Sequence, residues 1–195
     1  MCLMSLSNSN KMKKIELHPQ VFLIEDFLSL EECNAYLNRF ENETFEEAKI
    51  NMHGRQVMRK DVRNNDRFIL FDQALANELW KKTKPFVEEE LGVYEAIGLN
   101  EMFRIYRYNP GQRFRMHRDG TYHRNAKECS FYSFLIYLND NFKGGETEFQ
   151  KLSTVVPKKG TALIFRHPHR HEGKELIEGT KYVLRSDIMY RIKEN

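Results

Sequence analysis

The residues best suited to chemistry are a histidine and an aspartate two positions apart, His117 and Asp119, and a histidine far downstream, His171. In an extended segment, residues two apart project to the same side, so His117 and Asp119 would face one point. Two neutral imidazoles and one carboxylate, with the other coordination positions open, suit a non-haem Fe(II) site. A His-x-Asp pair alone is weak evidence in a chain with seven histidines. Its weight comes from the ordered motifs that follow it.

Length and composition indicate one folded domain. The 195 residues are 41% hydrophobic and 12% aromatic, enough to bury a substantial core, so we expect residues 1–195 to form a single domain. The net charge of +3 is too small to indicate nucleic acid by itself. Three widely spaced cysteines argue against a disulfide framework or a Cys-based zinc site. No stretch is apolar enough to span a membrane, so we expect a cytoplasmic location and no membrane partner.

The first half of the chain predicts two helices. Ser29 and Glu32 form a capping-box pattern ahead of an amphipathic helix over Leu30–Phe40. A second apolar stripe predicts a helix from Gln73 to about Glu90, which Pro85 would kink or divide into two shorter pieces. We therefore expect a helical support for a β-rich second half.

The segments around these helices predict strands and loops. Residues 1–14 are polar, and we expect them to be loose. Gln20–Asp26 and Phe45–Ile50 predict short strands. Asn51–Arg67 has no apolar period and six basic residues, His53 included, so we expect a long mobile loop that could cover a site. Residues 15–97 would then be the helical support with its lid loop.

From Gly98 onward the pattern changes to strands. Runs rich in aromatic and β-branched residues alternate with turn signals such as Asn109-Pro110-Gly111. Two helices followed by such strands predict helices packed on one face of a β-sandwich or jelly roll, a mainly β (α+β) fold. The expected strands are Met102–Tyr108, Phe131–Leu138, Thr147–Leu152, Thr161–Phe165, Leu176–Ile177 and Lys181–Tyr190.

The order of the motifs over residues 98–191 resembles a known family. It is similar to the catalytic domain of the prolyl 4-hydroxylase-like Fe(II)/2-oxoglutarate-dependent dioxygenases. The resemblance implies a double-stranded β-helix (jelly roll) core whose open end holds the metal. The motifs that carry it are His117-Arg-Asp119, Phe134-Leu-Ile-Tyr137-Leu-Asn139, Gly144-Gly145-Glu-Thr147-Glu-Phe149, Val156-Pro157-Lys-Lys-Gly160-Thr-Ala162-Leu-Ile-Phe165, His171-Glu-Gly173 and Gly179-Thr-Lys181-Tyr182.

The resemblance also implies the metal ligands. His117, Asp119 and His171 would bind Fe(II) and form the catalytic centre. His167 and His169 alternate with His171, but in the family pattern the ligand precedes the glycine, here Gly173, by two positions. We expect these two neighbours to face solvent or to support the site from outside the coordination sphere. His53 and His123 are expected not to be ligands.

The co-substrate residues follow from the same resemblance. A buried carboxylate must meet a fixed cation and hydrogen-bond donors. Lys181, ten residues after His171, would bind the distal carboxylate of 2-oxoglutarate together with Tyr137, and Tyr108 would line the pocket. Arg185 is the alternative cation, because it shares a strand face with Lys181 and could bind a carboxylate bidentately.

The implied activity is hydroxylation of an unactivated C–H bond with Fe(II), 2-oxoglutarate and O2, and with ascorbate as a reductant. A prolyl residue of a protein is the first substrate choice, and a free amino acid or small metabolite is the second. Nucleic acid is disfavoured, since no aromatic residues stand among the arginines to stack flipped bases. A non-catalytic jelly-roll binding module is the alternative of another class, and the oligomeric state stays open. The arginines expected near the mouth, Arg104, Arg107, Arg113, Arg115 and Arg118, suggest an acidic or polar partner.

Overall fold

The chain folds mainly into β-structure, with 47% of it in strands and 14% in helices. The computed structural model describes residues 11–52 and 55–194, so the predictions for residues 1–10 and for His53 lie outside the described residues. No helix among the described residues is long and apolar enough to cross a membrane. The elements in chain order are β1 (Lys13–His18), β2 (Val21–Glu25), α1 (Leu30–Phe40), β3 (Glu46–Glu47), β4 (Ile50–Met52), β5 (Arg55–Val57), β6 (Asp66–Phe71), α2 (Gln73–Thr83), the 3-10 helix η1 (Lys84–Phe86), β7 (Glu90–Leu91), β8 (Tyr94–Leu99), β9 (Met102–Tyr108), β10 (Phe114–His117), β11 (Glu128–Tyr137), β12 (Lys143–Gly144), β13 (Thr147–Phe149), β14 (Thr154–Val155), β15 (Ala162–Arg166), β16 (His171–Gly173), β17 (Leu176–Glu178) and β18 (Lys181–Ile192).

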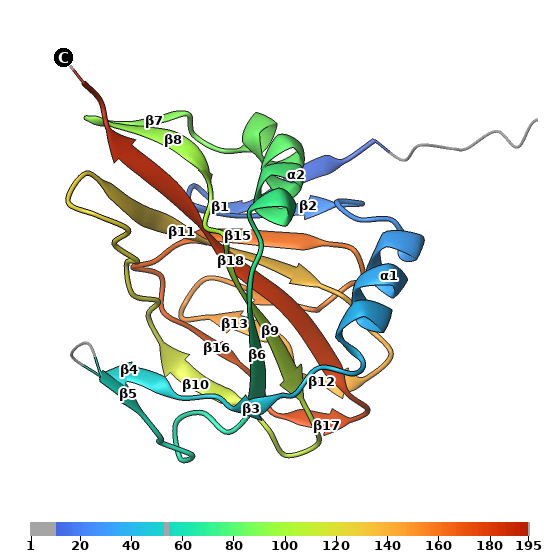
Figure 1. Ribbon diagram of the computed structural model, residues 1–195. Coiled ribbons are helices and arrows are strands. Elements are labelled where there is room, and N and C mark those ends of the chain that lie inside the picture. Colours follow the sequence, from blue (N-terminus) through green and yellow to red (C-terminus); the bar gives the residue numbers. More distant parts are fainter. Residues whose placement is uncertain (1–10, 53–54, 195) are drawn as a thin grey trace, which may run out of the picture.

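Two antiparallel sheets face each other (Figure 1). The large sheet has ten strands in the order β1-β2-β15-β11-β18-β9-β6-β3, with β8 pairing with β18 and β7 pairing with β8. The small sheet has four strands in the order β10-β16-β13-β14. This arrangement confirms the predicted mainly β fold with a jelly-roll core.

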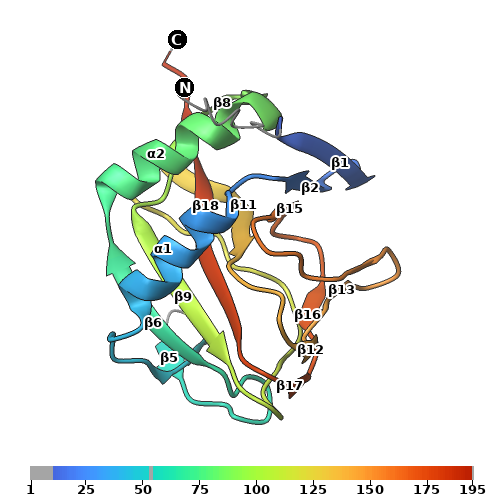
Figure 2. The same ribbon diagram turned by 90° about the vertical axis from the view of Figure 1, so that its right-hand side faces the viewer.

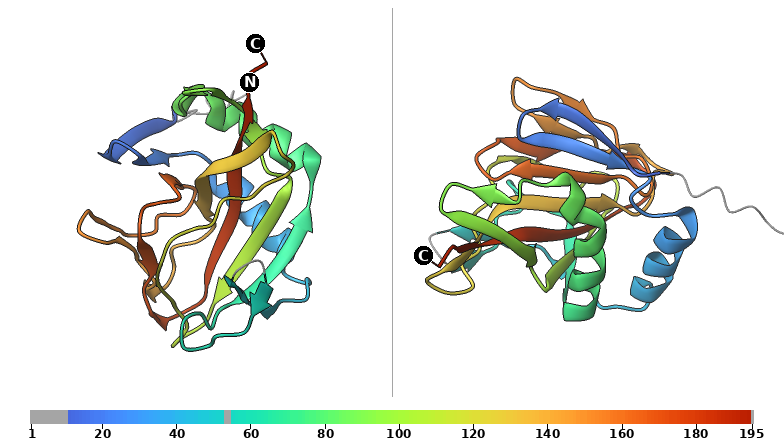
Figure 3. Two further views of the ribbon diagram at one scale, coloured as in Figure 1. Left: turned by 90° about the vertical axis from the view of Figure 1, so that its left-hand side faces the viewer. Right: turned by 90° about the horizontal axis from the view of Figure 1, so that it is seen from above.

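Both helices lie on the outer face of the large sheet, away from the small sheet (Figures 2 and 3). Helix α1 begins at the predicted capping box, in which Ser29 and Glu32 bond each other's backbone N–H groups. Helix α2 begins after Asp72, whose carboxylate accepts from the N–H of Leu75 at 2.9 Å. Pro85 lies in η1, so the second helix is divided as predicted, but helical structure ends at Phe86 rather than near residue 90.

The core has two layers because strand residues alternate between the faces of the large sheet. On β11, Phe134 and Ile136 face the helices and are fully buried. Tyr137 belongs to the second layer, between the sheets, with Phe149 from β13 and Val183 from β18. This second layer surrounds the pocket described below.

The first half of the chain is more than a helical support. Strands β1 and β2 extend the large sheet beyond β15, and β6 pairs with β9 along its whole length. The predicted strand at Gln20–Asp26 is confirmed by β2, but residues 15–97 are not mainly a helical support, because β1, β2 and β6 are strands of the large sheet. Strand β6 was missed because its short apolar run, Phe68–Phe71, follows a long polar stretch and cannot be distinguished from a helix start by period alone.

Asn51–Arg67 is not a long loop. Strands β4 and β5 form a hairpin in which Ile50 pairs with Val57, and a turn then leads to β6. The hairpin forms a sheet of its own, in which Arg55 and Gln56 of β5 are exposed. No apolar alternation therefore marks its sequence. The segment nevertheless lies beside the site, since Gln56, Val62, Arg63 and Arg67 line the pocket.

Candidate metal centre and co-substrate pocket

The two candidate histidine ligands lie opposite each other on neighbouring strands. His117 ends β10 and pairs in register with His171, the first residue of β16, and their ring centroids are 4.2 Å apart. Asp119 follows His117 by two residues. One potential ligand atom from each of the three residues lies within 4.8 Å of the others. The structure thus brings together the three residues that the sequence singled out.

Backbone carbonyls select the tautomer of both histidines. Nδ1 of His117 lies 2.8 Å from the carbonyl oxygen of Arg115, and Nδ1 of His171 lies 3.1 Å from that of His169. A carbonyl can only accept, so each Nδ1 donates its proton, and Nε2 is the nitrogen that a neutral ring would offer to a metal. Burial lowers the pKa of His171 to about 4, so its imidazole is neutral at physiological pH. Both Nε2 atoms face Asp119, at 3.5 Å for His117 and 3.8 Å for His171.

Two donors orient the Asp119 carboxylate. Ser133 Oγ donates to Oδ2 at 2.5 Å, and a guanidinium nitrogen of Arg185 lies 3.1 Å from the same oxygen. Burial alone would raise the pKa of Asp119, but the Arg185 charge, and the two imidazoles after it, hold this pKa well below its usual range. The carboxylate is ionised, with Oδ2 already bonded and Oδ1 turned towards His117. This donor set fits a divalent cation bound by two imidazoles and one carboxylate oxygen.

Lys181 lies at the base of the pocket, where it is 3% exposed. Its ammonium donates to the carbonyl oxygen of Gly145 at 2.5 Å and lies 5.3 and 5.4 Å from the ring centroids of Tyr108 and Tyr137. Burial lowers the pKa of Lys181 to about 7, because no carboxylate is close enough to stabilise its charge fully. The hydroxyls of Tyr137 and Thr147 bond each other at 2.8 Å.

Arg185 bonds different partners from those of Lys181. It shares the pocket-facing side of β18 with Lys181, as predicted, but it bonds Asp119 and Asp187, each at 3.1 Å. Its charge is therefore already paired with two carboxylates. An incoming carboxylate would meet a free cation at Lys181 and a paired one at Arg185.

The other histidines among the described residues lie outside the ligand set. His167 is buried rather than solvent-facing, and its Nε2 lies 3.6 Å from Oδ1 of Asp187. His169 is partly buried and packs edge-on against His18 at 5.2 Å between ring centroids. His123 is exposed.

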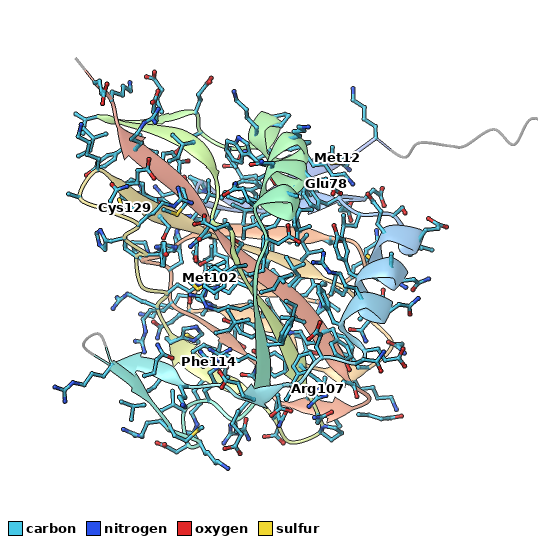
Figure 4. All side chains as sticks on the ribbon, viewed as in Figure 1. Met12, Glu78, Met102, Arg107, Phe114 and Cys129 are labelled. Atoms are coloured by element: carbon cyan, nitrogen blue, oxygen red, sulfur yellow. The ribbon has the colours of Figure 1, made fainter. Side chains whose placement is uncertain are left out.

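The three candidate ligands, Lys181 and Arg185 line one pocket of 430 Å³. This volume is typical of small-molecule sites. Of the arginines predicted near the mouth, only Arg104 and Arg118 line it. Arg107 and Phe114 are labelled in Figure 4. Arg107 bonds Asp66 and stacks over Phe45, whereas Phe114 lines the pocket and lies stacked on the His117 ring at 3.5 Å between centroids.

Sequence reasoning missed Arg63 and Tyr106, which line the pocket, and Ser133, which bonds the Asp119 carboxylate. The alternation Tyr106, Tyr108 on β9 and Ser133, Leu135, Tyr137 on β11 was a usable signal, since period-two residues share a face. Burial alone would raise the pKa of Tyr106, but the surrounding guanidinium groups, above all that of Arg63, lower it to about 8.

Comparison with known proteins shows which family the β-rich second half of the chain resembles. Residues 103–186 match the family model of the 2OG-Fe(II) oxygenase superfamily. The chain is 24% identical over 193 residues to prolyl 4-hydroxylase 1 of Arabidopsis thaliana, an alignment that covers 84% of this chain and 66% of that protein. Residues 103–186 form a 2OG-Fe(II) oxygenase domain that is similar to those of prolyl 4-hydroxylases.

Solved structures share the fold of this oxygenase domain. The viral collagen prolyl hydroxylase of Paramecium bursaria Chlorella virus-1, in its 2OG complex, superposes with a TM-score of 0.65 at 20% identity, covering 89% of this chain and 97% of that one. A prolyl hydroxylase from Trichoplax adhaerens, in complex with a hypoxia inducible factor oxygen degradation domain peptide, gives 0.67 at 18% identity, covering 87% and 83%. The oxygenase family implies Fe(II), 2-oxoglutarate and O2. The chain spans just under two thirds of the Arabidopsis protein's length.

Proposed function

We propose that this protein is an Fe(II)- and 2-oxoglutarate-dependent dioxygenase that hydroxylates a prolyl residue of a peptide or protein. The observation that carries the proposal is the convergence of three ligand atoms within 4.8 Å at a pocket with a buried ammonium at its base. Relatives named prolyl hydroxylases, one of them in complex with a peptide, support the substrate class.

His117, Asp119 and His171 would hold Fe(II). Their fit rests on the donor set, which consists of two imidazoles whose Nε2 atoms face one ionised carboxylate. Bound Fe(II) and 2-oxoglutarate would supply the oxidising chemistry, in which O2 is consumed, 2-oxoglutarate is converted to succinate and CO2, and a C–H bond is hydroxylated. Ascorbate would serve as a reductant of the iron.

The protein's own part is to bind, orient and exclude water. Lys181 would pair with the distal carboxylate of 2-oxoglutarate, and the Tyr137–Thr147 hydroxyl pair would complete its hydrogen bonds. Tyr108 packs over the Lys181 ammonium and closes this end of the pocket to solvent. Arg185 and Ser133 would keep Asp119 oriented towards the metal.

The same proposal includes the domain organisation and the cellular location of the protein. The whole chain, residues 1–195, would act as one domain, since β1, β2 and β6 are strands of the same sheet as β18. A cytoplasmic, reducing location is supported by Cys33 and Cys129, which are free and buried rather than bridged.

The test is Fe(II)-dependent release of succinate from 2-oxoglutarate. We expect His117→Ala and Asp119→Ala to abolish it, and the exposed His123→Ala to serve as the matched control. Under argon, Fe(II) and 2-oxoglutarate should give the wild type a weak visible charge-transfer band that both ligand variants lack. A normally folded wild type without this band would point to the non-catalytic binding module instead.

A further inference from the structure

The pocket has a second charged end, four residues along β9 from the co-substrate end. Tyr108 pairs with Lys181, Tyr106 with Val183, and Arg104 with Arg185 in the β9–β18 register. On the other side of β9, Arg67 of β6 pairs with Tyr106. All these side chains line the pocket. Four strand residues span roughly 13 Å, at about 3.3 Å per residue, so a 2-oxoglutarate bound at Lys181 leaves the Arg104 end free.

Arg63 brings an unpaired charge to this end. It is 6% exposed, and its guanidinium lies between the rings of Tyr106 and Phe114, 4.3 and 4.4 Å from their centroids. Its Nε donates to the neutral amide of Asn65 at 2.7 Å, and among the described residues its buried Nη2 has no hydrogen-bond partner. Burying a guanidinium without a counter-charge costs free energy, which a bound anion would offset.

Arg104 and Arg67 are only partly compensated. Arg104 reaches Asp187 at 3.4 Å, the long limit of a hydrogen bond, and Asp187 already bonds Arg185. Arg67 is 8% exposed and bonds Glu46 at 3.1 Å. The phenol of Tyr106, with its lowered pKa, lies in the field of these guanidinium groups.

The charge balance of the pocket favours an anionic ligand besides 2-oxoglutarate. Within the described part of the chain, seven cationic side chains line it against two carboxylates, Asp119 and Asp187. Glu46, which pairs with Arg67, lowers the surplus to four. Fe(II) and the 2-oxoglutarate dianion would cancel each other, so the surplus persists in the loaded enzyme.

We infer that the hydroxylated substrate carries a carboxylate, which binds between Arg63 and Arg104 beside the Tyr106 hydroxyl. The inference rests on the proposed function and narrows its substrate class. The carboxylate belongs either to a small N-acylated amino acid or to an acidic residue next to the target in a peptide.

The test compares acid and neutral probes on the full-length protein loaded with Mn(II) and 2-oxoglutarate. One pair is N-acetyl-L-proline and N-acetyl-L-prolinamide, and the other is the capped peptides Glu-Pro-Glu and Gln-Pro-Gln. Binding is measured by calorimetry. We expect an acid to bind at least tenfold more tightly than its neutral partner, the effect of one charge-assisted hydrogen bond or more. The pair that shows this preference identifies the source of the carboxylate.

Substitutions of Arg104 test whether the preference for the acid probes depends on this residue. Arg104→Gln should reduce it about tenfold, and Arg104→Lys should restore part of it because the charge is kept. Arg113→Gln is the matched control, since it removes the same charge from a residue that pairs with Glu175 outside the pocket. Equal affinity for acid and neutral probes, no binding of either acid, or a preference unchanged in Arg104→Gln would overturn the inference.

A separate readout distinguishes the two proposals. The charge-transfer band of Fe(II) and 2-oxoglutarate under argon is recorded on the same wild-type preparation. A normal band without acid preference rejects only the carboxylate inference. A missing band rejects the oxygenase proposal itself.

Discussion

A guanidinium nitrogen of Arg185 lies 3.1 Å from Oδ2 of Asp119, the oxygen to which Ser133 also donates. The residue first considered as an alternative cation for 2-oxoglutarate thus neutralises a candidate metal ligand. Without a metal, Arg185 is the main counter-charge of both Asp119 and the 2% exposed Asp187. A bound divalent cation would share this role at Asp119.

We expect Arg185→Met to destabilise the metal-free protein by about 3 kcal/mol, because Asp119 loses its guanidinium partner and Asp187 keeps only the more distant Arg104. Mn(II) should raise the melting temperature of this variant more than that of the wild type, since the metal replaces the lost charge at Asp119. Thermal unfolding with and without Mn(II) checks both statements. Equal metal-induced shifts in the two proteins would contradict the coupling between Arg185 and Asp119.

Ser133→Ala should lower metal affinity about tenfold while leaving the fold intact, because the carboxylate loses the hydrogen bond that fixes its orientation. Competition with a chelator measures the affinity. Ser153→Ala is the control, since Ser153 Oγ is buried and bonds no described residue.

Lys181→Met should raise the 2-oxoglutarate requirement about 100-fold without loss of metal, because the distal carboxylate loses its charged partner. Met keeps the length and apolar packing of the lysine stem. Titration of succinate release against 2-oxoglutarate gives the requirement, and exposed Lys127→Met is the control. If Arg185→Met shows this effect instead, the assignment of Lys181 is wrong.

The affinity for 2-oxoglutarate should fall as pH rises above 7. The free pocket holds Lys181 with a pKa of about 7, whereas a bound carboxylate favours the ammonium and raises that pKa. Binding above pH 7 must therefore take up a proton, and the affinity should fall roughly tenfold per pH unit. Calorimetry in buffers of different ionisation enthalpy measures the uptake. Lys181→Met should bind 2-oxoglutarate weakly and without this pH dependence.

Tyr106 should ionise near pH 8 in the folded protein, two units below its ordinary value of 10. Between these pH values the folded state binds fewer protons than the unfolded state, so Tyr106 adds stability that rises with pH from about 8 to 10. Near-ultraviolet absorbance of tyrosinate follows the titration. The early step should vanish in Tyr106→Phe and persist in Tyr122→Phe.

Gly160→Ala should be more destabilising than Gly111→Ala. Both glycines have positive φ angles near 80°, so each substitution costs about 1–2 kcal/mol in backbone strain. A Cβ at residue 160 would also meet the carbonyl oxygen of Leu28 at 2.3 Å, whereas one at residue 111 meets nothing within 4 Å. Chemical denaturation measures the difference, and equal losses would mean that the Leu28 segment yields to the new methyl group.

The sequence by itself determined the class of fold and the candidate ligands. Strong period-two runs such as Met102–Tyr108 predict strands because alternate side chains are buried, and the observed β9 has the same bounds. His117 and Asp119 were identifiable by their residue types and their spacing of two, whereas His171 was chosen among three alternating histidines through the family resemblance. The Ser29 capping box was equally readable, since both of its bonds lie within four residues.

Only the tertiary structure decided what depends on partners distant in the chain. The pairing of Arg185 with Asp119, 66 positions away by their numbers, separates it from Lys181, although both share one strand face. The β4–β5 hairpin forms a sheet separate from the large and the small sheet. Its sequence therefore carries no apolar period by which it could be predicted. Arg63 meets the Tyr106 ring only because segments from both halves of the chain enclose one pocket, and burial and charge compensation are properties of that enclosure.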